Sequence, residues 1–164
     1  MRFQIFLLLT VAAAILGCAT RPDAPAGCLT KAHFPAKAYE AWRQAPTHLT
    51  SSETIANAPL LQIGVRTTVQ LKKTENENRG FVQFQTQSAA DYFIVSDFYP
   101  RLNVLDVSSG NTSLSAEAWG PVRECDTMKK SLRFKLNGIN KYGLEIISRD
   151  STVVSILVLP ATAN

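Results

Sequence analysis

The stretch LQIGVRTTVQLK, residues 61–72, alternates apolar and polar side chains over most of its length. Its apolar residues share one parity: Leu61, Ile63, Val65, Val69 and Leu71. Successive side chains of a β-strand point to opposite faces, so this alternation predicts one long strand with a buried face. The period of two continues through the rest of the chain and decides the fold class.

Further strands are predicted after this one, at 81–87, 92–97, 102–107, 112–119, 131–136, 142–148 and 152–159. Turn-forming residues separate them, such as Gly120-Pro121 and Asn137-Gly138. Short strands at this spacing form antiparallel sandwiches or barrels. The sequence therefore predicts a mainly β protein, an antiparallel, jelly-roll-like β-sandwich of about eight strands that occupies residues 59–160.

The composition agrees with one compact domain. The chain has 164 residues, of which 46% are hydrophobic and 18% charged, and its net charge is +4. A disordered chain would be less apolar, a collagen would need many more than 8 Gly, and 3 Cys are too few for a disulfide-dense miniprotein.

Residues 28–58 are predicted to form a short helical and loop segment before the sheets. Good helix formers fill residues 36–44, and the TSSE motif at 50–53 has the spacing of a capping box before a second helical turn. Tyr39 and Trp42 lie three residues apart and share one helix face. They could form a ligand platform, but at this spacing we expect them to pack the helix onto the main body.

The first 17 residues have the organisation of an export signal. A short basic start, Met1-Arg2, precedes an apolar run at 3–16 that is interrupted only by Gln4 and Thr10. A helix needs about 20 apolar residues to span a bilayer core of roughly 30 Å, and this run is shorter. Residues 1–17 are therefore predicted to be a signal peptide and not a permanent anchor.

The motif ILGC, residues 15–18, resembles the lipobox of bacterial lipoproteins: an aliphatic residue, a tolerated position, a small residue and then cysteine. The resemblance implies that the thiol of Cys18 carries a diacylglycerol and that residues 18–27 tether the folded part to the membrane. Ala19 in the position after the cysteine implies an outer-membrane lipoprotein facing the periplasm. The alternative is an ordinary signal peptide that is cleaved near Ala19 or Thr20.

Two cysteines remain if Cys18 is acylated. Cys28 and Cys125 would lie in a compartment that permits oxidation, and they are predicted to form a disulfide. Such a bridge closes a loop of about 100 residues, for which the chain-entropy model gives roughly 4.7 kcal/mol. Neither cysteine belongs to a C-x-x-C motif, which favours a structural role over redox chemistry.

A second resemblance extends over the predicted strands. Its motifs are FVQF (81–84), YFI (92–94), LNVLD (102–106), LRFKL (132–136) and YGLEI (142–146). Together with Gly138, their order resembles the bacterial prepeptidase C-terminal type of jelly-roll domain. The resemblance implies a secreted accessory module, of a kind that in some cases contacts proteins or polysaccharides. It implies no binding residues, because three residues separate Gly138 from Tyr142 where the family has Gly and Tyr two apart.

The sequence contains no recognisable catalytic or metal-binding motif. Its histidines, His33 and His48, precede the predicted strands and lack the spacing of metal ligands. Asp97, Asp106 and Asp126 could meet around Ca²⁺, but Asp at a strand end is more often part of a turn. There is also no nucleophile elbow or Gly-rich phosphate loop. We therefore predict no enzymatic activity, no cofactor and no metal site.

One part of the chain is strongly basic. Residues 123–141 contain 6 basic and 2 acidic residues, a net charge of +4. Within this range the candidates for contact with an anionic surface, such as lipid headgroups, acidic glycans or an acidic protein face, are Lys129, Lys130, Arg133 and Lys135. Arg133 and Lys135 alternate with apolar residues and are expected to face solvent. The alternative is that these cations only protect an edge strand from aggregation.

These features predict a membrane-anchored envelope lipoprotein that acts as a non-catalytic binding or adaptor module for an envelope protein or glycan. The alternative is a periplasmic inhibitor or immunity lipoprotein that acts against a toxin or lytic enzyme. Nucleic acid is not expected as a partner, because the chain is predicted to be exported and its charge surplus is small.

Overall fold

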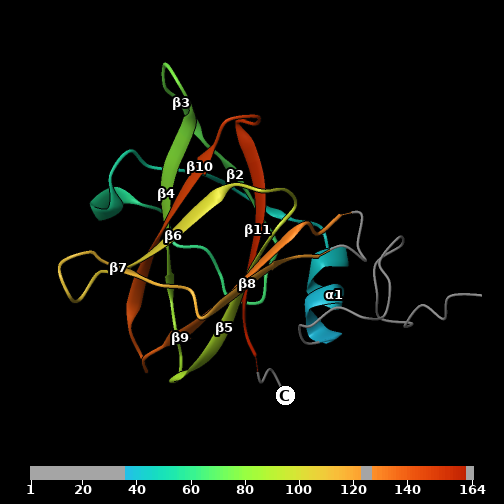
Figure 1. The fold of residues 1–164 in the computed structure, drawn as a ribbon, viewed down its shortest axis with the longest axis vertical. Coiled ribbons are helices and arrows are strands. Elements are labelled where there is room, and N and C mark those ends of the chain that lie inside the picture. Colours follow the sequence, from blue (N-terminus) through green and yellow to red (C-terminus); the bar gives the residue numbers. More distant parts are fainter. Residues whose placement is uncertain (1–35, 123–126, 162–164) are drawn as a thin grey trace, which may run out of the picture.

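The described part of the protein is mainly β, with two sheets and one short α-helix on the outside (Figure 1). The computed structural model describes residues 36–122 and 127–161. The six-stranded sheet contains, in spatial order, β1 (Thr47–Thr50), β2 (Thr67–Gln70), β11 (Val153–Pro160), β5 (Ala90–Ser96), β9 (Lys130–Leu136) and β8 (Ala118–Pro121). The five-stranded sheet contains β3 (Lys72–Lys73), β4 (Asn78–Gln85), β10 (Lys141–Ser148), β6 (Arg101–Asp106) and β7 (Thr112–Leu114). Every described strand pair is antiparallel except β1 and β2, which are parallel.

The main core takes side chains from both sheets. The six-stranded sheet contributes Val69, Ile94, Phe134, Ile156 and Val158, and the five-stranded sheet contributes Val82, Phe84, Val104, Leu144 and Ile146. These residues lie at alternate positions of their strands, as a half-buried strand requires. Full burial of one such side chain stabilises the fold by about 1.5–3 kcal/mol.

Helix α1 (Ala36–Arg43) covers the outer face of the six-stranded sheet (Figure 1). Tyr39 and Trp42 are each 1% exposed, and they belong to a second buried cluster with Val95 of β5 and Leu157 of β11. The expectation that this aromatic pair packs the helix onto the main body is therefore confirmed. No helix in the part of the chain that the structure describes is long and apolar enough to span a bilayer.

The prediction of one strand over residues 61–72 is wrong. Gly64 has φ +80°, a left-handed conformation that glycine adopts without steric cost, and it interrupts the extended backbone. Strand β2 begins only at Thr67, while the backbone N–H of Leu61 donates to the carbonyl of Gln83 at 2.8 Å. The residues with alternating side chains therefore belong to a loop and to the two short strands β2 and β3.

The predicted strand at 112–119 is divided between the sheets. Strand β7 ends at Leu114 in the five-stranded sheet, and β8 begins at Ala118 in the other. The N–H of Glu117 already donates to the carbonyl of Arg133 at 2.8 Å, so the chain changes sheets within three residues. Gly120-Pro121, expected as a turn, belongs to β8.

The sheets begin before residue 59. Strand β1 lies inside the segment expected to be helix and loop, and it forms one edge of the six-stranded sheet. The capping-box prediction at 50–53 is also wrong, because the 3₁₀ turn η1 (Ile55–Asn57) has Thr54 as its N-cap and no side-chain cap. Instead, Ser52 Oγ accepts the N–H of Thr54 at 3.3 Å.

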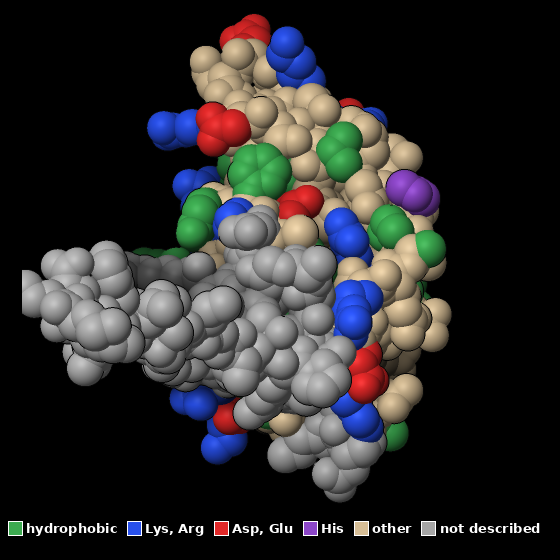
Figure 2. All heavy atoms as spheres, turned by 90° about the vertical axis from the view of Figure 1, so that its right-hand side faces the viewer, with side chains coloured by type: hydrophobic (Ala, Val, Ile, Leu, Met, Phe, Trp, Pro, Cys, Tyr) green, Lys and Arg blue, Asp and Glu red, His purple; other side chains and the backbone are tan. Residues whose placement is uncertain are grey.

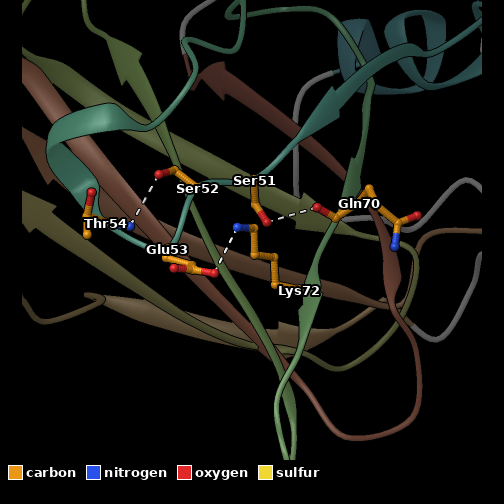
Figure 3. A network of polar contacts seen from close by, with 6 residues as sticks. All are labelled: Ser51, Ser52, Glu53, Thr54, Gln70 and Lys72. Carbon is orange, nitrogen blue, oxygen red and sulfur yellow. Dashed lines mark hydrogen bonds and ion pairs between the residues drawn. The ribbon is translucent and has the colours of Figure 1, made fainter.

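Residues 51–61, here the cover segment, pass along the outer side of β4 beyond the two residues that pair with β3. Ser52 and Phe81 exchange backbone hydrogen bonds of 3.0 and 2.8 Å, and the N–H of Gln83 donates to the carbonyl of Pro59 at 2.8 Å. Figure 3 shows how side chains secure its start: Ser51 Oγ donates to the carbonyl of Gln70 at 2.8 Å, and Lys72 Nζ lies 2.8 Å from Glu53 Oε1. The cover segment thus satisfies polar groups along this edge of the five-stranded sheet.

Candidate binding surface

The predicted basic residues lie at the start of β9 and along it, where they divide into two groups. Leu132, Phe134 and Leu136 are buried, which confirms the predicted alternation, and Arg133 and Lys135 project to the other face. Arg133 Nε lies 3.9 Å from Asp91 Oδ2 and 3.8 Å from Glu117 Oε2. Two carboxylates therefore offset the charge of Arg133, while Lys135 is exposed.

Lys130 has a structural role at the first position of β9. It shares the parity of Leu132, so its side chain points toward the gap between the sheets, where the chain crosses from β5 to β6. Its Nζ donates to the carbonyl of Pro100 in that crossing at 2.7 Å. Burial lowers the pKa of Lys130 below its ordinary value. Lys129 precedes it and is half-buried.

An exposed tryptophan marks the edge strand beside these lysines. Trp119 of β8 pairs in register with Leu132 of β9, yet it is 73% exposed. Among the described residues no strand pairs with the other side of β8. A Cβ added at Gly120 would meet no described atom within 4 Å, so the face of the sheet above this residue has room for a side chain.

A second exposed aromatic residue lies in the crossing from β5 to β6. Tyr99 is 59% exposed and directly precedes Pro100, the acceptor of the Lys130 ammonium group. Pro121 pairs in register with Lys130, so Trp119 lies two residues away from this point along β8. Lys130 therefore lies next to both the segment that carries Tyr99 and the strand that carries Trp119. We define the β8 edge surface as Tyr99, Arg101, Trp119, Lys129 and Lys130.

The large exposed hydrophobic side chains of the described residues are dispersed, since Leu60, Ile139 and Val153 lie on other segments than Trp119 and Tyr99. On the face shown in Figure 2, the coloured hydrophobic groups are likewise scattered among charged and other polar groups. Trp119 was missed as a site residue, because the sequence pattern placed it inside a long strand. The signal that could have revealed it is the sequence Trp-Gly-Pro, since Pro is tolerated at edge strands.

The described aspartates act in local structure. Asp106 Oδ1 accepts the N–H and the hydroxyl of Ser108 at 2.9 and 2.7 Å, and the hydroxyl bond holds the pKa of Asp106 below its ordinary value. Asp97 Oδ1 accepts the N–H of Ser155 at 3.0 Å, and burial raises the pKa of Asp97. The turn reading is thus confirmed for Asp106, and Asp126 lies outside the described residues.

No group of three or more His, Cys, Asp or Glu side chains within residues 36–122 and 127–161 could hold a metal ion. His48 lies on the exposed edge strand β1, and His33 is outside the described part of the chain. A hollow of about 220 Å³ lies between α1 and the end of β11, with Lys37, Glu40 and Pro160 in its lining. None of its lining residues is a cysteine, serine or histidine that could act as a nucleophile or imidazole base.

The three cysteines lie outside the described residues. Acylation of Cys18 and pairing of Cys28 with Cys125 therefore stay predictions from the sequence.

Comparison with known proteins found no family model and no curated protein that matches this chain.

Proposed function

We propose that this protein is a non-catalytic binding module of the bacterial cell envelope, held at the membrane by a lipid on Cys18. The observation that carries the binding role is the indole of Trp119, which is 73% exposed on an open edge strand. Trp and Tyr are enriched in binding surfaces because they contribute large contact area at little entropic cost. Exposure of both Trp119 and Tyr99 around Lys130 favours a surface site over an enclosed pocket.

The strand order supports a jelly-roll β-sandwich as the architecture of this module. After β4, the chain alternates between the sheets, with β5 in the six-stranded sheet, β6 and β7 in the five-stranded sheet, β8 and β9 in the six-stranded sheet, and β10 and β11 on opposite sides. Jelly rolls consist of two sheets with Greek-key connections and occur in many binding proteins. The main core between the sheets agrees with this proposal.

The location follows from the leader and the lipobox. The proposed mature chain would carry its acyl groups at Cys18, and two or more acyl chains hold a protein at a membrane much more firmly than one. Residues 18–27 would reach at most about 30 Å when extended, so the folded part would stay close to its leaflet. An outer-membrane position facing the periplasm would place the β8 edge surface near envelope proteins and glycans.

The test is photo-crosslinking in cells with the full lipidated chain. A photoreactive amino acid replaces Trp119, and in the control it replaces Ile139, which is 80% exposed in the loop between β9 and β10. We expect one envelope component to crosslink at position 119 and not at 139, with loss of the adduct when Cys18→Ala releases the protein from the membrane. Equal adducts at both positions, or none at 119, would overturn the proposal. Capture of a toxin or lytic enzyme at 119 would identify the module as an inhibitor.

A further inference from the structure

We infer that the β8 edge surface binds an anionic polysaccharide, an inference that rests on the function proposed above and names its ligand class. Trp119 and Tyr99 supply exposed ring faces on two different segments. Lys130 contacts both segments: its Nζ donates to the carbonyl of Pro100, next to Tyr99, and its backbone pairs in register with Pro121 of β8. The faces of aromatic rings carry negative charge in their quadrupole, and the C–H groups of a sugar ring carry small positive charge. A sugar can therefore stack on each ring.

The surroundings of the rings favour a sugar over an apolar protein partner. Among the described residues, the other large exposed hydrophobic side chains, Leu60, Ile139 and Val153, lie on other segments than the two rings. An apolar protein partner would require a continuous hydrophobic area, whereas a sugar needs single rings with polar groups beside them. Pro121 also leaves β8 without one backbone donor, which weakens the edge as a template for an added strand.

The charge around the rings favours an anionic ligand. Arg101 follows Pro100 and is exposed, and Lys129 precedes Lys130. Neither side chain takes part in an ion pair with another described residue. Asp97 and Glu117, the described acidic residues that precede Arg101 and Trp119 in the chain, are engaged elsewhere, Asp97 with the N–H of Ser155 and Glu117 with Arg133. Among the described residues, no carboxylate therefore offsets the charge of Arg101, which is free to attract carboxylate or phosphate groups on the polysaccharide.

The chain offers a direct optical probe of this site. It contains two tryptophans, and Trp42 is 1% exposed while Trp119 is 73% exposed. Acrylamide, a neutral quencher, should reach Trp119 and leave Trp42 largely unaffected. A sugar that stacks on Trp119 should therefore reduce the quenching of the fluorescence.

The experiment uses the lipidated protein in detergent with four polymers: polygalacturonate, phosphorylated mannan, uncharged dextran and polyglutamate. Polygalacturonate and phosphorylated mannan separate carboxylate from phosphate as the recognised anion. Dextran tests stacking without charge, and polyglutamate tests charge without sugar. We expect at least one anionic polysaccharide to bind about tenfold more tightly than dextran and polyglutamate, and to protect Trp119 from acrylamide.

The variants separate the two contributions to binding. Trp119→Ala should weaken binding about tenfold, and Arg101→Gln with Lys129→Gln should weaken it and reduce its dependence on salt. Ile139→Ala, an exposed hydrophobic control, should bind like the unmodified protein. Equal binding of polyglutamate, or unchanged binding by Trp119→Ala, would overturn the inference.

The outcomes also distinguish this inference from the proposed function. A protein that crosslinks specifically at position 119, together with no polysaccharide binding, would overturn only the ligand class. Absence of both the crosslink and polysaccharide binding would overturn both proposals.

Discussion

The two sheets differ in how one edge of each is covered: the edge at β3 and β4 in the five-stranded sheet, and the edge at β8 in the six-stranded sheet. The outer side of β4, where the short strand β3 leaves it unpaired, is occupied by the cover segment, which exchanges backbone hydrogen bonds with Phe81 and Gln83. The free side of β8 has no such partner among the described residues, and it carries Trp119 exposed to solvent. An unpaired edge strand invites association with other chains, and proteins commonly block such edges. The protein blocks one edge with its own backbone, which makes the edge at β8, with its exposed Trp119, a better candidate for an external partner than the covered edge.

The largest expected effect comes from breaking the covered edge at Gly80. A Cβ added there would clash with the Cβ and Oγ of Ser51. The Ser51 side chain cannot move away easily, because its Oγ donates a hydrogen bond to the carbonyl of Gln70. Gly80→Ala should therefore lower the free energy of unfolding by about 1–3 kcal/mol, measured by urea denaturation. The matched control is Gly120→Ala on β8, where the added Cβ meets nothing within 4 Å. Equal stability losses in the two variants would contradict the difference between the edges.

A smaller effect is expected where a side chain reinforces the cover segment. Gln83 Nε2 donates to the carbonyl of Ile55 at 2.5 Å, and Gln83 is buried. Gln83→Ala should lower the free energy of unfolding by about 1 kcal/mol, because the carbonyl of Ile55 loses its donor. Gln85→Ala on the same strand is the control, since Gln85 is exposed. Hydrogen exchange should show faster opening of residues 52–61 in Gln83→Ala alone, and unchanged exchange would argue against this contact.

At the β8 edge, Lys130 should make the stability of the protein depend on pH in the alkaline range. Burial lowers the pKa of Lys130 in the folded protein, whereas the unfolded chain has the ordinary value of about 10.4. Between the lowered value and the ordinary one, the unfolded chain binds more protons, so this group makes stability rise with pH. Lys130→Met should lack that rise. Parallel curves of unfolding midpoint against pH for the two proteins would show that Lys130 is not desolvated at this position.

The smallest effect is expected for the ion pair of the cover segment. Lys72 bonds to Glu53 and holds the pKa of Glu53 below its ordinary value, so any contribution is lost as the pH falls through that lowered value. Both side chains are exposed, and exposed pairs contribute little to stability. Glu53→Gln should leave the melting temperature unchanged at neutral pH in moderate salt. A clear loss would mean that side chains, and not the backbone bonds, hold the cover segment on β4.

Several strands could be predicted from the sequence because their side-chain alternation matches their burial. In β9, β10 and β11 the predicted and observed bounds differ by at most one residue at each end. The failures have local causes. At Gly64 a positive φ breaks the backbone while the apolar alternation continues, and a pattern of side chains carries no information about φ.

The candidate surface could be predicted only in part. Lys130 and Arg133 were identified by charge, but their partners, Pro100 and the two carboxylates, come from other strands. Strand β1 was missed because the four residues THLT are too short to establish a period. Trp119 could not be identified as exposed, because the edge position of β8 depends on the sheet order and not on its own sequence.

The last strand of the chain lies in the interior of its sheet. Strand β11 lies between β2 and β5, so only residues 153–160 join the β1–β2 pair to the strands β5, β9 and β8 in one sheet. Contacts between residues so distant in the chain form late and slowly during folding. We therefore expect the pairing of β11 to be a late and slow step of folding, which joins the two parts of the six-stranded sheet.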